Sequence, residues 1–143
     1  MLMQSVLLRR FRYISIHYDI RMKKPNSGDY ISNGALHTFE HLFATYARNS
    51  EYADSVIYVG PTGCRTGFYL LLRSNVKKSE ALSPVRKAFE FIVNFEGEIP
   101  GSKRRECGNY KEHDLLGAKE IALDVLNVLS EKTEADMVKA ISC

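Results

Sequence analysis

The sequence has no apolar run long enough to cross a membrane. Its longest unbroken stretch of hydrophobic side chains covers residues 68–72, whereas a spanning helix needs about 20 such residues. The first eight residues are largely apolar, but they lack the basic start and the long apolar centre of a signal peptide. We therefore expect no membrane partner for this chain.

An excess of charge of one sign is also lacking. The 20 Lys and Arg residues against 17 Asp and Glu residues leave a net charge of +3, and the basic residues form short, scattered clusters. This distribution is typical of solvated faces and indicates no nucleic-acid partner. Cysteine is limited to three residues, and an odd number favours a reducing cytoplasm over a disulfide scaffold.

Internal repeats, low-complexity segments and linkers are absent as well. Hydrophobic residues make up 45% of the 143 residues and charged residues 26%, which is typical of globular proteins. We therefore expect a single domain that covers residues 1–143 and has one sizeable core.

Hydrophobic periodicity predicts both strands and helices. Apolar and polar side chains alternate over residues 14–22 and again over 66–72, and residues 55–59 are rich in strand-forming types. Apolar residues recur at spacings of three and four in the segments between and after these strands. The predicted helices begin at Ser32-Asn33, at Ser83-Pro84 and after the N-cap Asp114, and a short fourth helix is predicted over residues 134–141.

The order of these elements lacks a strict strand-helix-strand rhythm. Helices that follow antiparallel strands pack most naturally on one face of the sheet. The sequence therefore predicts an α+β fold with a mainly antiparallel sheet and helices packed on one of its faces.

Residues 37–41, His-Thr-Phe-Glu-His, lie inside the first predicted helix. Positions four apart are neighbours on a helix surface, so His37 and His41 can share one metal ion, with Glu40 beside them. The alternative interpretation is an amphipathic helix that carries two surface histidines.

A metal site built on two histidines needs a third ligand from elsewhere. The sequence offers Cys64, Cys107, His113 and Cys143. Cys64 follows a Gly-Pro-Thr-Gly loop between two predicted strands, and Cys107 lies shortly before the third helix. One thiolate could bind the metal while the other transfers protons, although each could instead be a small buried hydrophobic residue.

Three separated motifs together resemble the S-ribosylhomocysteine lyase (LuxS) family. They are residues 37–44 (His-Thr-Phe-Glu-His-Leu-Phe-Ala), residues 60–69 (Gly-Pro-Thr-Gly-Cys-Arg-Thr-Gly-Phe-Tyr) and residues 106–110 (Glu-Cys-Gly-Asn-Tyr). They occur in the order found in the family, and the resemblance runs from about Tyr18 to Leu129. This combination is far more specific than any one motif, and it implies a LuxS-like, metallohydrolase-like form of the α+β fold.

The resemblance implies one divalent metal per chain, held by His37, His41 and Cys107 with water in the open position. The metal would be Fe2+, replaceable by Zn2+ or Co2+. Glu40 and Cys64 would be the paired catalytic acid/base groups. A carbonyl must be activated and protons moved on both sides of a carbon chain, and a Lewis acid with a carboxylate and a thiolate suits that chemistry.

The implied substrate is S-ribosylhomocysteine, which is cleaved by successive carbonyl migration and β-elimination. The products are homocysteine and 4,5-dihydroxy-2,3-pentanedione, the autoinducer-2 precursor used in quorum sensing. Arg21 matches an arginine that lines the family's substrate pocket, and Gly63 and Arg65 are assigned to substrate binding with it. The resemblance also implies a cytoplasmic bacterial homodimer with its active sites at the subunit interface.

The chain departs from the family pattern in two respects. Only a short leader precedes the first predicted strand, and Tyr58 and Gly60 stand where the family has polar contacts to the substrate. Two alternatives therefore stand beside the lyase. One is an inverzincin-type metallopeptidase, since residues 37–41 also fit the pattern His-x-x-Glu-His, and the other is a LuxS-like metal-binding protein without lyase activity.

Overall fold

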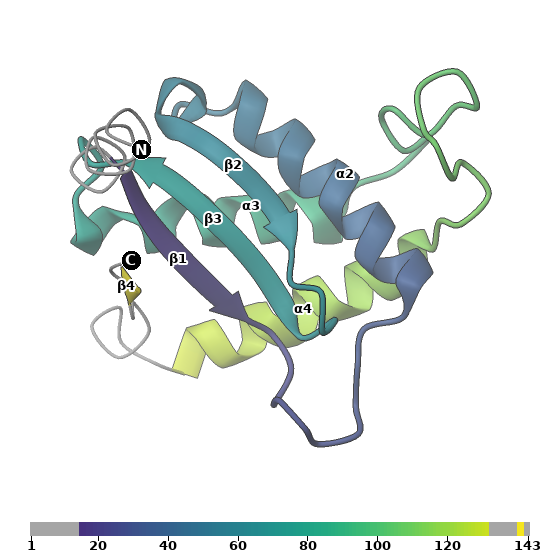
Figure 1. Ribbon diagram of the computed structural model, residues 1–143, viewed down its shortest axis with the longest axis horizontal. Coiled ribbons are helices and arrows are strands. Elements are labelled where there is room, and N and C mark those ends of the chain that lie inside the picture. Colours follow the sequence, from purple (N-terminus) through teal and green to yellow (C-terminus); the bar gives the residue numbers. More distant parts are fainter. Residues whose placement is uncertain (1–14, 132–139, 142–143) are drawn as a thin grey trace, which may run out of the picture.

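A computed structural model describes residues 15–131 and 140–141 of the chain (Figure 1). The strands form one four-stranded antiparallel sheet in the order β2-β3-β1-β4, and the helices lie on one side of it, which confirms the predicted α+β fold. The strands are β1 (Ser15–Arg21), β2 (Val56–Pro61), β3 (Gly67–Arg73) and β4 (Ala140–Ile141), and the α-helices are α2 (Asn33–Asn49), α3 (Leu82–Asn94) and α4 (Leu115–Glu131).

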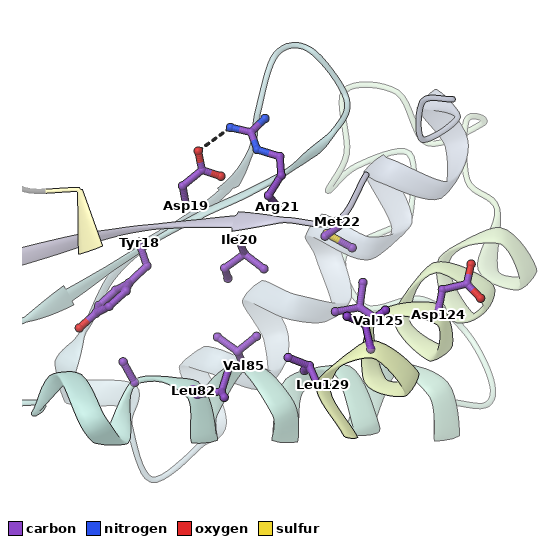
Figure 2. A pocket seen from close by; sticks show the side chains of 12 residues that line it. Tyr18, Asp19, Ile20, Arg21, Met22, Leu82, Val85, Asp124, Val125 and Leu129 are labelled. Atoms are coloured by element: carbon purple, nitrogen blue, oxygen red, sulfur yellow. Dashed lines mark hydrogen bonds and ion pairs between the residues drawn. The ribbon is translucent and has the colours of Figure 1, made fainter. Parts of the chain in front are cut away.

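The core lies between the sheet and the three helices. Along β1, Tyr18 and Ile20 point toward α3 and α4, whereas Asp19 and Arg21 point to the other face of the sheet (Figure 2). This alternation is the two-residue period of a strand with one buried face. The centre of the core is a cluster of four fully buried aromatic rings with centroids between 4.9 and 6.1 Å apart, contributed by α2, β3 and α3: Phe39, Phe43, Phe68 and Phe89.

The pairing of β1 with β3 positions one end of the sheet for function. Arg21, the last residue of β1, lies opposite Gly67, the first residue of β3. A side chain at residue 67 would collide with the Ile20 carbonyl oxygen, so the close approach of the two strands requires glycine here. The pairing brings Arg21 beside the turn that joins β2 to β3.

The predicted helices agree with the structure except at two points. Helix α3 begins at Leu82, so Pro84 is its third residue rather than its first, a position in the first turn where no amide hydrogen is needed. The predicted tail helix is wrong at its end, because Ala140 and Ile141 pair with β1 as strand β4. The edge of β1 offers unpaired backbone groups that favour strand addition. Residues 134–139 of that prediction lie outside the described residues.

Within the described ranges, none of the helices combines the length and the apolar character needed to cross a bilayer.

Candidate metal centre

Helix α2 presents two histidines beside its buried face. The Ser32 side chain accepts a hydrogen bond from the first turn and caps the helix, while the fully buried Phe39 and Phe43 fix the rotation of the helix about its axis. His37 and His41 lie one turn apart, and their Nε2 atoms are 3.1 Å from each other. The two rings therefore converge on one point.

Two backbone carbonyls fix the tautomers of both rings. Nδ1 of His37 lies 2.7 Å from the Glu112 carbonyl oxygen, and Nδ1 of His41 lies 2.8 Å from that of Pro100. Because a carbonyl oxygen only accepts hydrogen bonds, each Nδ1 carries the proton and each Nε2 keeps its lone pair for a metal ion. The loop passes close to His41 at Gly101, whose φ of 70° is left-handed.

Cys107 supplies a third donor from the loop between α3 and α4. Its Sγ atom is 3.3 Å from Nε2 of His37 and 3.9 Å from Nε2 of His41. A tetrahedral ion with bonds of about 2.0 Å to nitrogen and about 2.3 Å to sulfur would hold two nitrogens about 3.3 Å apart and a nitrogen and a sulfur about 3.5 Å apart. The observed separations agree with these values, so the three donors fit one divalent ion.

His113, the residue before the Asp114 cap of α4, brings a fourth donor to the same place. Its Nε2 atom is 4.0 Å from the Cys107 sulfur, and all four residues have a ligand atom within 4.8 Å of the others. Burial, and then the charges of His37 and His41, lower the pKa of His113 and favour the neutral ring. The sequence offers His113 as a candidate ligand, but no local pattern places it in the cluster, because its contact with His37 depends on how the loop before α4 returns to α2.

A cavity of about 590 Å³ opens beside these donors, a size typical of small-molecule sites. Half-buried Glu40 lines it from the same face of α2 as the two histidines. Tyr58 of β2 also lines it, is 51% exposed, and lies so close to Gly60 that a side chain there would collide with the phenol ring. Tyr58 and Gly60, which stand where the family has polar contacts to the substrate, therefore pack against each other beside the cavity.

Cys64 lies in the turn between β2 and β3, outside the group of four metal donors. Its sulfur is 3.0 Å from the Thr66 hydroxyl, 3.5 Å from the Thr62 hydroxyl and 3.5 Å from Nη1 of Arg21. The hydrogen bonds with Thr66 and Thr62, with a smaller contribution from Arg21, lower the pKa of Cys64 from 9.0 to about 7. This exposed thiol is therefore about half ionised at neutral pH.

The residues predicted to bind substrate gather around Cys64. Arg21 pairs with the Asp19 carboxylate and donates to the Thr66 hydroxyl. Gly63 and Arg65 line a cavity of about 450 Å³ with Cys64, and they are its neighbours in the chain.

One strand end connects this turn to the metal donors. Pro61, the last residue of β2, lines a further cavity together with His37 and Glu40. Cys64 follows Pro61 by three residues, so its turn begins near His37. Cys64 and Glu40 nevertheless line different cavities in the part of the chain that the structure describes.

A further cavity lies on the helix side of β1. This cavity of about 210 Å³ lies between β1, α3 and α4 (Figure 2). It is lined mainly by apolar side chains such as Ile20, Val85 and Val125, and its described lining includes no histidine or cysteine. It therefore offers no imidazole or thiol of the kind found at the other sites.

Comparison with known proteins gives a family match over most of the chain. The family model described as S-Ribosylhomocysteinase (LuxS) matches residues 9–136. The chain belongs to the LuxS family. Proteins named S-ribosylhomocysteine lyase are similar to it over most of its length. The one from Phocaeicola vulgatus is 44% identical over 122 residues, which cover 84% of this chain and 76% of the relative. Those from Borreliella afzelii and Clostridium beijerinckii are 44% and 42% identical and cover 83% and 85% of this chain and 76% and 77% of the relatives.

Membership of the LuxS family does not favour the metallopeptidase alternative. An inverzincin site expects a downstream glutamate as its third ligand, whereas the residues that join the histidine pair in the described structure are Cys107 and His113. The structure thus brings together His37, His41 and Cys107 in a group that could hold one metal. The roles of Glu40, Cys64, Arg21, Gly63 and Arg65 stay predictions, as does the identity of the metal.

Proposed function

We propose that this chain is a metal-dependent carbon-sulfur lyase that cleaves S-ribosylhomocysteine to homocysteine and 4,5-dihydroxy-2,3-pentanedione. The observation that carries the proposal is the convergence of two tautomer-fixed imidazoles and a thiol, with separations that fit one ion, in a chain of the LuxS family. The relatives at 40–44% identity bear the name of this activity.

His37, His41 and Cys107 would hold the metal, with Fe2+ as the expected ion and Zn2+ or Co2+ as substitutes. A divalent ion there supplies Lewis-acid chemistry, which polarises a sugar carbonyl and stabilises the negative charge that forms when a neighbouring proton leaves. The neutral Nδ1–H groups, held by the Glu112 and Pro100 carbonyls, orient both rings for this role.

Cys64 is proposed as one of two proton carriers. With a pKa of about 7, its thiolate can take a proton from the carbon next to the carbonyl, and the resulting thiol can return it to the adjacent carbon. This exchange moves the carbonyl along the sugar without net loss of protons. The Thr66 and Thr62 hydroxyls and Arg21 hold the sulfur in its reactive form.

Glu40 is proposed as the second proton carrier, acting from the side of α2. It lines both cavities that contain His37, so its carboxylate can exchange protons with the hydroxyl groups of a substrate in the larger one. In the last step a proton next to the carbonyl is removed and the carbon-sulfur bond breaks. The homocysteine thiolate leaves, and the remaining enol rearranges to the dione.

Substrate binding and assembly complete the proposal. Arg21, Gly63 and Arg65 surround Cys64 and are proposed to bind the substrate beside it. We propose a homodimer with active sites at the subunit interface, because the helices of the described part leave one face of the sheet uncovered (Figure 1). A cytoplasmic location stays a prediction.

The decisive experiment measures thiol release from S-ribosylhomocysteine by the iron-loaded protein. We expect turnover by the wild type and a loss of at least about 100-fold in Cys64→Ala and in Glu40→Gln, the range expected for removal of a general acid or base. Stoichiometric metal without thiol release from folded protein would instead show a metal-binding protein without lyase activity.

The same material tests the peptidase alternative. Cys107→Ala is expected to lose its metal, because only two of the three proposed ligands remain. A Cys107→Ala protein that kept a full equivalent of metal would reject the proposed ligand set and favour a peptidase arrangement.

A further inference from the structure

His113 contacts the metal donors without an assigned role. Its Nε2 atom lies 4.0 Å from the Cys107 sulfur, and its Nδ1 atom lies 3.1 Å from the hydroxyl oxygen of Thr38. Thr38 is fully buried on the inner side of α2. His113 thus lies between a buried hydroxyl and the one sulfur among the proposed ligands.

The orientation of the His113 ring favours a role other than binding the same ion as His37. The two rings are stacked, with centroids 4.0 Å apart and planes inclined by only 21°. A metal ion binds in the plane of an imidazole ring, along the nitrogen lone pair. The nitrogen lone pairs of His37 and His113 therefore lie in nearly parallel, separate planes and do not point to one position. His41, by contrast, meets His37 at 77°, so these two planes intersect and can share an ion.

The Thr38 hydroxyl decides which nitrogen of His113 carries the proton. Its oxygen accepts a hydrogen bond from the Asp114 amide at 2.8 Å. In the described part of the chain its other partner is Nδ1 of His113. A buried hydroxyl hydrogen needs an acceptor, so we assign this hydrogen to Nδ1. Nδ1 is then the acceptor, and the proton of the neutral ring is on Nε2, the atom that faces the sulfur.

We propose that His113 is a positioning residue that donates its Nε2–H to the Cys107 thiolate, with its tautomer fixed by Thr38. This hydrogen bond holds the sulfur toward the histidine pair and withdraws electron density from it. The proposal rests on the proposed metal site but not on the identity of the substrate. His37 and His41 have the opposite tautomer, so the cluster contains two lone-pair donors and one hydrogen-bond donor.

The test uses cobalt(II) added to metal-free protein, with no substrate present. The visible bands of cobalt report its coordination number, and the near-ultraviolet band that arises from charge transfer reports the electron density on the thiolate. The variants are His113→Phe, which keeps a stacked ring without a donor, His113→Gln, which restores an N–H donor, and Thr38→Val. Thr45→Val is the matched control, because it makes the same change two turns further along α2, where the hydroxyl donates to the His41 carbonyl.

We expect the charge-transfer band of His113→Phe to move to longer wavelength while its visible bands stay those of the wild type, and cobalt affinity to fall about 10- to 100-fold. Thr38→Val should show a smaller shift in the same direction. In His113→Gln the charge-transfer band should lie closer to its wild-type position, and in Thr45→Val it should lie at the wild-type position.

Three results would overturn the proposal. A change in the visible bands of His113→Phe would show that a metal ligand had been lost. An unmoved charge-transfer band in this variant would show that His113 has a packing role only. An equal shift in Thr45→Val would show that the effect of Thr38→Val is not specific to the hydrogen bond between Thr38 and His113. If His113→Phe does not fold, His113→Gln and Thr38→Val decide between these outcomes. Since no turnover is measured, a negative result here and a negative thiol-release assay are separate findings.

Discussion

At the scale of single residues, Cys64 and Cys107 show how surroundings separate two thiols of the same chain. Cys64 is exposed in a turn and lies beside two hydroxyls and a guanidinium. Cys107 is half-buried among imidazoles. The first environment stabilises a free thiolate, and the second suits a ligand that shares its charge with a metal.

The reactivity of Cys64 should follow its lowered pKa. We expect its alkylation by iodoacetamide to reach half its maximal rate near pH 7, and Thr66→Val to move this midpoint toward the ordinary value of 9.0, because Thr66 contributes most to the shift. Peptide mapping by mass spectrometry measures the modification at residue 64 separately from the other cysteines. An unchanged midpoint in Thr66→Val would show that the hydroxyl is not the cause.

The same shift makes stability depend on pH. Since the pKa of Cys64 is lower in the folded state than in the unfolded chain, the thiolate contributes stability that is fully present above pH 9 and is lost as the pH falls through about 7. Cys64→Ser should remove this dependence from urea unfolding curves measured between these values.

The residue scale is also where sequence-based prediction reached its limit. The spacing of His37 and His41 predicts a shared site because helix geometry is local. The tautomers of their rings could not be predicted, because the carbonyls of Pro100 and Glu112 come from 59 and 75 positions away. The stacking of His113 on His37 depends in the same way on how a distant loop returns to α2.

At the scale of elements, the close approach of β1 to β3 limits which side chains can occupy residue 67 at the end of the sheet. We expect Gly67→Ala to lower the free energy of unfolding by about 2–3 kcal/mol, since its new methyl group meets the backbone of Ile20, which cannot rotate away. Gly60→Ala should cost less than about 1 kcal/mol, because it meets only the end of the half-exposed Tyr58 side chain.

Urea unfolding of the two glycine variants provides the comparison, with each serving as the control for the other. Equal losses would mean that the backbone contact at residue 67 relaxes as easily as a side chain. A loss of thiol release in Gly67→Ala that exceeds its loss of stability would further show that Arg21, opposite in the register, had moved.

Elements with strong periodicity were predictable, and the exceptions have physical causes. The alternation in β1 and the capped starts of α2 and α4 are local signals, and the structure has them within about two residues of the predicted positions. The end of the chain was predicted as helix, yet Ala140 and Ile141 form a strand. Pairing with the edge of β1 is a long-range contact that overrides local preference.

At the scale of the whole molecule, a bound metal would join α2 to the loop between α3 and α4. Metal at 100 times its dissociation constant adds about 2.7 kcal/mol to the stability of the folded state. For a protein of this size that corresponds to a Tm rise of about 5–10 °C. We expect a chelator to lower the Tm of the metal-loaded wild type by this amount.

Two cysteine variants make this thermal prediction specific. Cys107→Ala should lose the chelator-sensitive shift, because it removes a proposed ligand. Cys64→Ala should keep the full shift, because its sulfur is outside the metal donors. Scanning calorimetry with and without chelator measures all three proteins, and a full shift in Cys107→Ala would contradict the proposed site.

The last prediction concerns the face of the sheet that the helices leave uncovered. Along β3, Phe68, Leu70 and Leu72 are buried under the helices, so Leu71 lies on the opposite face and is only half-buried in one chain. If two chains meet through this face, Leu71→Arg should convert the dimer to a monomer in sedimentation velocity, because a charge would be buried without a partner. Leu123→Arg, at an exposed position of α4, should leave the dimer intact.

Thiol release should fall with dissociation, because the active sites are proposed to lie at the interface, and a fully active Leu71→Arg monomer would refute that placement.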